Sequence, residues 1–145
     1  MPMANYSIKA KSKSAAKIIS KTQGGFEIII DEPEEQGGTN DGPNPVEYVL
    51  SALAGCLNVV GHLVAQEMGF NLKDLEIEIS GQLDPAKFMG QSDEARAGYQ
   101  KIEVKMIADT DADQATLAKW LKTVEARCPV SDNLSKQTPV EIGLK

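Results

Sequence analysis

The chain has 145 residues, a size typical of a single domain, and 41% of them are hydrophobic, which is enough for one core. Its formal net charge of −6 excludes general nucleic-acid binding, because binding to phosphates requires a positive surface. Two cysteines are too few for a disulfide-stabilised scaffold, and the first residues lack the apolar segment of a secretory signal. We therefore expect one domain over residues 1–145, in a reducing cytoplasm, with no nucleic-acid partner.

The first part of the chain predicts three short strands. Apolar and polar residues alternate over residues 5–12, and residues 15–22 are expected to form a second strand. Gly24 and Gly25 mark a hairpin turn into a third strand at 26–30.

A loop follows, and then a long helix is expected over residues 45–68. Three residues have the types and spacing of a capping box with a proline in the first turn: Asn44, Pro45 and Glu47. Gly69 is expected to end the helix.

The second part predicts two strands, a helix, a short helical piece and a last strand. The strands are expected at 73–83 and around 102–106, the helix at about 112–126, the helical piece at 129–135 and the last strand at 138–144. The order βββ-α-ββ-α-β indicates an α+β fold with antiparallel strand pairing.

The long helix contains a stretch without charged residues that requires a membrane check. Residues 48–65 have no Asp, Glu, Lys or Arg, and their length is at the lower limit for a span. Ser51, Asn58 and His62 interrupt the stretch. We interpret it as a helix buried on most sides, with no membrane partner and with a second subunit as its natural cover.

The two cysteines lie in different settings. Cys56 is in the middle of the long helix, on one stripe with Val49, Leu53, Val60 and Leu63. Buried cysteines are often inert packing residues, so a structural role and a redox role both stay open for Cys56.

Cys128 is expected to be the N-cap of the short helical piece, with Arg127 beside it. Free backbone N–H groups and a nearby cation lower the pKa of a thiol, so local chemistry alone favours Cys128 as the more activated cysteine. The alternative is a small apolar residue that ends the stripe of the preceding helix. The chain has one histidine, His62, and no CxxC, HxxxH or GxGxxG motif, so we expect no metal and no cofactor.

Three motifs in this order resemble the OsmC and organic hydroperoxide resistance family. They are Gly42-Pro43-Asn44-Pro45-Val46-Glu47 opening the helix that carries Ala54-Gly55-Cys56, then Cys128-Pro129-Val130-Ser131, then Thr138-Pro139-Val140-Glu141. The resemblance implies an α+β fold in which antiparallel sheets surround long central cysteine-bearing helices in an intertwined homodimer.

The resemblance also implies an activity, the thiol-dependent reduction of hydroperoxides, organic ones above all and hydrogen peroxide as a further candidate. It makes Cys56 the peroxidatic cysteine, which forms a sulfenic acid, and Cys128 the resolving cysteine, which forms a disulfide with it. A dithiol, either a lipoyl protein or a thioredoxin-like protein, would restore both thiols.

The chain departs from the family catalysts at two places. Those proteins carry a glutamate directly after the proline of the first motif, where this chain has Val46, with Glu47 one residue later. They also use an arginine from the N-terminal strands, whereas the first arginine here is Arg96. Glu47 and Arg127 are the candidates for supporting residues, and Glu47 has a capping role as its alternative. These departures leave a second function open, a non-catalytic binding or redox-sensing protein with a small apolar ligand cavity near Cys56.

Overall fold

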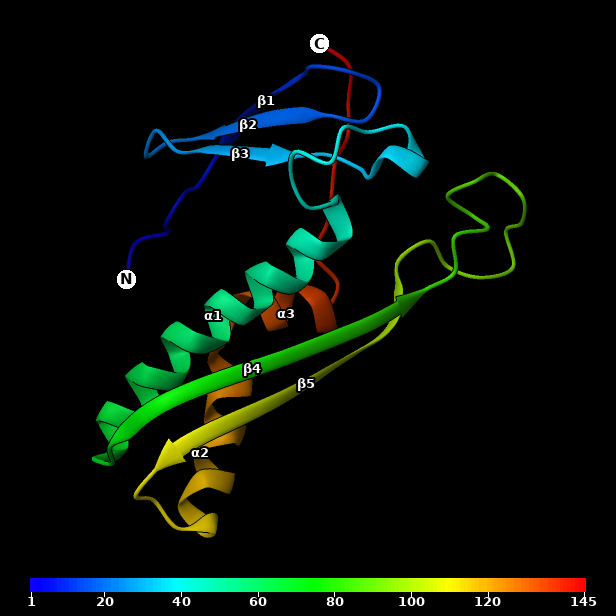
Figure 1. The fold of residues 1–145 in the computed structure, drawn as a ribbon. Helices are drawn as coiled ribbons and strands as arrows, with labels where there is room; N and C mark the ends of the chain where they lie inside the picture. Colours follow the sequence, from blue (N-terminus) through cyan, green and yellow to red (C-terminus); the bar gives the residue numbers. More distant parts are fainter. The chain divides into compact units, whose positions relative to one another are not determined.

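The computed structural model describes residues 1–145, which form two compact units, Met1–Val49 and Leu50–Lys145. Each unit contains one antiparallel sheet (Figure 1). The predicted α+β class with antiparallel pairing is confirmed.

The first unit is a three-stranded meander. β1 (Ile8–Ser12), β2 (Ile18–Thr22) and β3 (Glu27–Ile30) lie in that order, with Ile8 opposite Thr22 and Ile18 opposite Ile30. Gly25 makes the turn between β2 and β3 with φ of +87°, a backbone conformation that glycine adopts without strain. A short 3₁₀ helix, η1 (Glu34–Gln36), follows β3.

A buried carboxylate organises the loop after β3. Asp31 has no exposed surface, and its two oxygens accept hydrogen bonds from the Glu32, Thr39 and Asp41 N–H groups and from the Thr39 hydroxyl. Burial alone would raise the pKa of Asp31, but these hydrogen bonds outweigh it and lower that pKa to about 2. Lys17 lies 3.9 Å from the same carboxylate and pairs with Asp41.

The long helix α1 (Pro45–Met68) has the predicted bounds. The Asn44 side chain accepts from the Glu47 N–H at 2.9 Å, and the Glu47 carboxylate accepts from the Asn44 N–H at 3.0 Å. This reciprocal pair is a capping box, which satisfies two backbone donors that the helix start leaves free. Gly69, with φ of +77°, follows the last helical residue, as expected for a helix end.

The second unit is built on a long hairpin. β4 (Leu72–Leu83) and β5 (Tyr99–Thr110) pair antiparallel, so the second strand is longer than the predicted 102–106. Alternate residues pack against the core, and they are Leu75, Ile77, Ile79, Ile102, Met106 and Ala108. The opposite face is polar over most of its length, as in the cross-strand pair of Glu78 and Lys105.

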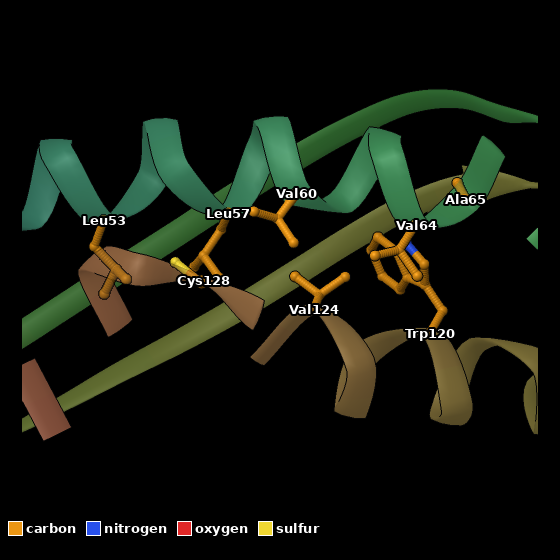
Figure 2. Packing of buried hydrophobic residues seen from close by; sticks show 8 residues of the cluster. All are labelled: Leu53, Leu57, Val60, Val64, Ala65, Trp120, Val124 and Cys128. Atoms are coloured by element: carbon orange, nitrogen blue, oxygen red, sulfur yellow. The ribbon is translucent and has the colours of Figure 1, made fainter. Parts of the chain in front are cut away.

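The core of this unit lies between α1 and the C-terminal helices α2 (Gln114–Arg127) and α3 (Pro129–Ser135). Figure 2 shows side chains from α1 pointing toward those of the C-terminal segment, and the labelled set is Leu53, Leu57, Val60, Val64, Ala65, Trp120, Val124 and Cys128. Two of these, Val124 and Cys128, have no exposed surface.

Within this chain α1 is buried along one face, and the second subunit that was expected to cover the rest of the helix stays a prediction. Leu53 and Val60, which were expected on the stripe of Cys56, are buried, whereas Leu63 is 45% exposed. Leu57 and Val64 complete the buried stripe. The buried residues of this helix pack against the C-terminal helices and the hairpin, and at its first turn the Tyr48 hydroxyl donates to the carbonyl oxygen of Ile29. By length and composition α1 is able to cross a membrane, with 33% of its most apolar stretch buried, but one such helix is weak evidence because core helices of soluble proteins meet the same criteria.

Trp120 joins α2 to α1 at a point of close approach. Its indole N–H donates to the carbonyl oxygen of Gly61 at 2.8 Å, and its ring lies edge-on to Phe70 with the ring centres 6.2 Å apart. A Cβ atom at residue 61 would lie 3.2 Å from Trp120 Cζ2, so the glycine is what allows the indole to reach the backbone of α1.

The predicted last strand at 138–144 is absent. Residues 136–145 carry no regular hydrogen-bonded structure beyond the end of α3, and Val140, Ile142 and Leu144 are exposed. Their alternation is that of a strand, but a strand forms only beside another strand, and none in this chain pairs with them.

Candidate active site

Cys128 occupies the junction between two helices. It is the residue that ends α2, and it is also the N-cap of α3, where its sulfur accepts a hydrogen bond from the Ser131 N–H at 3.4 Å. Pro129 is the first residue of α3, so the predicted N-cap position of Cys128 is confirmed. The junction therefore fixes the direction of the Cys128 side chain from both sides.

The structure brings the two cysteines together. Cys56, on α1, and Cys128 are 72 positions apart in the chain, and their sulfur atoms are 3.0 Å apart, with the Cys128 thiol donating to Cys56. Both are free thiols. A disulfide bond is about 2.0 Å long, so once one of the two sulfurs is oxidised a shift of roughly 1 Å brings them to bonding distance.

The two thiols differ in access to solvent. Cys128 has no exposed surface, whereas Cys56 is half-buried at the edge of the core face of α1. A molecule arriving from solvent therefore meets Cys56 first, with Cys128 behind it.

The expectation that Cys128 is the more activated thiol is wrong. Burial raises the pKa of the Cys128 thiol, and the hydrogen bond to Cys56 raises this pKa further. The Ser131 N–H acts in the opposite direction but does not reverse the shift. The N-cap geometry was predicted correctly. Its lowering effect on the pKa of Cys128 is smaller than the rise that burial of the sulfur causes.

Arg127, one of the two supporting candidates, is bound to a carboxylate on α1. Its guanidinium donates to both oxygens of Glu67, at 2.6 and 3.1 Å. This pair raises the pKa of Arg127 and lowers that of Glu67. The fork ties the end of α2, one residue before Cys128, to the last turn of α1, so Arg127 contacts a carboxylate rather than a thiol.

Glu67 was not singled out from the sequence, although a signal for it exists. It follows Cys56 by eleven positions, which is about three turns and leaves it about 20° away around the helix at about 100° per residue. A carboxylate on the cysteine face of the helix, with an arginine beside the second cysteine, is a pattern that predicts this ion pair.

The other polar residues considered from the sequence have local partners. Glu47 is bonded to Asn44 in the capping box, and the Nδ1 atom of His62 lies 2.9 Å from the carbonyl oxygen of Asn58. Histidine, cysteine and acidic side chains form no cluster able to hold a metal ion. The chemistry available at this site is therefore that of a close pair of thiols.

The two antiparallel sheets, the long helix and the short C-terminal helices define a class of α+β proteins with several solved members. An OsmC-like protein from Mycoplasma pneumoniae matches with a TM-score of 0.77 at 19% identity, covering 91% of this chain and 88% of that one. An organic hydroperoxide resistance protein OsmC from Legionella pneumophila matches with a TM-score of 0.63 at 21% identity, covering 91% of each chain.

The chain belongs to the OsmC-like protein family, whose sequence model matches residues 38–143. It is also 29% identical to YmaD of Bacillus subtilis, an uncharacterised protein. This match extends over 121 residues and covers 80% of this chain and 75% of YmaD. The resemblance drawn from the three sequence motifs is confirmed.

Proposed function

We propose that this protein is a thiol-dependent peroxidase that reduces organic hydroperoxides, with hydrogen peroxide as a further substrate. The observation that carries the proposal is the contact of two free thiols at 3.0 Å, one half-buried and one fully buried. The name of the similar Legionella pneumophila protein, organic hydroperoxide resistance protein, supports a peroxide-related redox role in this family.

In the proposed first step, the Cys56 thiolate attacks the terminal oxygen of the hydroperoxide. The S–O bond forms as the O–O bond breaks, so Cys56 becomes a sulfenic acid and the substrate leaves as an alkoxide, which takes a proton to give the alcohol. Cys56 takes the peroxidatic role because it is the thiol that solvent reaches.

In the proposed second step, Cys128 attacks the Cys56 sulfur. The S–S bond forms as the sulfenic S–O bond breaks, and the oxygen leaves as water. The sulfurs are already 3.0 Å apart, so this step needs no large rearrangement. A dithiol reductant, a lipoyl protein or a thioredoxin-like protein, then exchanges with the disulfide and restores both thiols.

We further propose that the protein acts in the cytoplasm as a homodimer. Two exposed apolar surfaces of the second unit support a partner of the same kind, the outer face of α1 with Val59 and Leu63, and the C-terminal segment with Val140 and Ile142. Sedimentation or light scattering in solution tests the dimer, and a monomer at working concentrations would contradict it.

The function is tested by mass spectrometry after one equivalent of an organic hydroperoxide is added to the reduced protein, with free thiols blocked before digestion. A Cys56–Cys128 disulfide formed within the mixing time supports the proposal. Cys56→Ser should abolish peroxide consumption, and Cys128→Ser should allow one round of reduction and then leave Cys56 as a sulfenic or further oxidised acid. Two unmodified thiols would contradict a peroxidase and favour a binding role for the same scaffold.

A further inference from the structure

The Cys56 sulfur has one hydrogen-bond partner within the second unit, the Cys128 thiol. Three ionisable side chains of α1, α2 and α3 are bound to other groups. Arg127 is paired with Glu67, Asp132 with Lys136, and His62 with the carbonyl of Asn58. The group that directly contacts the Cys56 sulfur is the second cysteine.

We propose that Cys128 is a catalytic residue in the first step of the reaction, before it forms any disulfide, because its S–H group donates a hydrogen bond to the attacking Cys56 thiolate. A hydrogen bond to the charged form of a group favours that form. The buried thiol would thus supply part of the stabilisation that the family catalysts obtain from an N-terminal arginine. This inference rests on the proposed peroxidase function.

The burial of Cys128 suits it to remain the protonated partner. The sulfur has no exposed surface, and both its burial and its contact with Cys56 raise its pKa. Of two thiols that share one hydrogen bond, the one removed from water is the one that keeps its proton, since burial disfavours the thiolate. Cys56, at the edge of the core, is the thiol that solvent and substrate reach.

The same proton is used in the second step. When Cys128 attacks the sulfenic sulfur, its proton passes to the departing hydroxyl group, and the two leave together as water. The Cys56 thiol loses its own proton to water before the first step, and the alkoxide product takes one back from water, so the protons balance over the cycle. The Ser131 N–H, bonded to the Cys128 sulfur at 3.4 Å, stabilises negative charge as it develops on that sulfur.

The test compares three proteins: wild type, Cys128→Ser and Cys128→Ala. Serine keeps a hydrogen-bond donor at residue 128 but forms no disulfide, whereas alanine removes the donor. The measurement is the rate constant for Cys56 sulfenic acid formation in a single turnover with cumene hydroperoxide, with the acid trapped by dimedone and followed against pH.

We expect Cys128→Ala to form the sulfenic acid about tenfold more slowly at neutral pH than Cys128→Ser, because a hydrogen bond to a charged group contributes at least this factor. We also expect the midpoint of its pH–rate profile to lie at higher pH. Equal rate constants and profiles in the two variants would overturn the inference, since a purely resolving cysteine has no effect before the disulfide step.

A second measurement separates this inference from the proposed function. Alkylation of Cys56 by iodoacetamide reports its thiolate without any peroxide, and its pH profile should shift in Cys128→Ala in the same direction. If wild type does not react with peroxide but this shift is found, the peroxidase function fails and the donor role stands. Should Cys128→Ala not fold, Cys128→Val fills the buried space without a donor and takes its place.

Discussion

The contact between Gly61 and Trp120 leads to a prediction about stability. Whether a mutation at residue 61 raises or lowers the free energy of unfolding should depend on the residue at position 120. Gly61→Ala should stabilise α1 by about 1 kcal/mol, because glycine is a poor helix former. The new Cβ atom would, however, lie 3.2 Å from Trp120 Cζ2 and 3.4 Å from Leu75 Cδ2. The indole cannot move away cheaply, since it is 2% exposed and bonded to the carbonyl of Gly61.

Overpacking of this kind costs about 1 to 3 kcal/mol. A middle value of about 2 kcal/mol exceeds the helix-propensity gain of about 1 kcal/mol. We therefore expect Gly61→Ala to lower the free energy of unfolding by about 1 kcal/mol. A phenylalanine ring at residue 120 does not reach the position of Cζ2. In a Trp120→Phe background the same mutation should therefore raise the free energy of unfolding by about 1 kcal/mol, the helix-propensity gain alone. The coupling energy between the two sites is then about 2 kcal/mol.

The assay is urea unfolding of the four proteins of this cycle, followed by far-UV circular dichroism. Fluorescence is unsuitable because Trp120 is the only tryptophan. The protein concentration is kept equal, since any association shifts apparent stability. Stabilisation by Gly61→Ala in the wild-type background, or equal effects in both backgrounds, would refute the steric argument.

Three further predictions concern other polar contacts. Asp31→Asn should destabilise the protein at neutral pH, and this loss of stability should shrink as the pH falls from about 4 toward 2. The reason is that the pKa of Asp31 is lowered to about 2, so its carboxylate contributes stability only while it is ionised. Urea unfolding at several pH values checks this, and a pH-independent loss would count against it. Asn44→Ala should cost about 1 kcal/mol in thermal or urea unfolding, whereas Glu47→Gln, which keeps an acceptor for the Asn44 N–H, should cost less. Glu67→Gln should lower stability by weakening the fork to Arg127, and its difference from wild type should narrow as salt is raised; a salt-independent difference would show that the ion pair is not its cause.

The elements that local chemistry specifies could be predicted from the sequence. Helix α1 begins and ends where it was expected because Asn44, Pro45, Glu47 and Gly69 act within a turn of the helix ends. The cap at Cys128 is local in the same sense, and it too was found.

The features that depend on a packing neighbour could not be predicted in the same way. Nearly every face of α1 is apolar, so its sequence does not tell which stripe will meet α2, and Leu57 is buried where Leu63 was expected. The contact between Cys56 and Cys128 joins residues 72 positions apart, and only family resemblance pointed to it. The burial of Cys128, which reverses its expected pKa shift, is likewise a property of the assembled core.

The double position of Cys128, as the end of one helix and the cap of the next, ties a backbone amide to the chemical state of a sulfur. The Ser131 N–H donates a hydrogen bond to that sulfur. A change of the sulfur from thiol to thiolate or disulfide therefore alters the electron density around the Ser131 amide proton. The Ser131 resonance in an amide NMR spectrum would thus be an internal indicator of the redox state, readable in unmodified protein without a dye or a label.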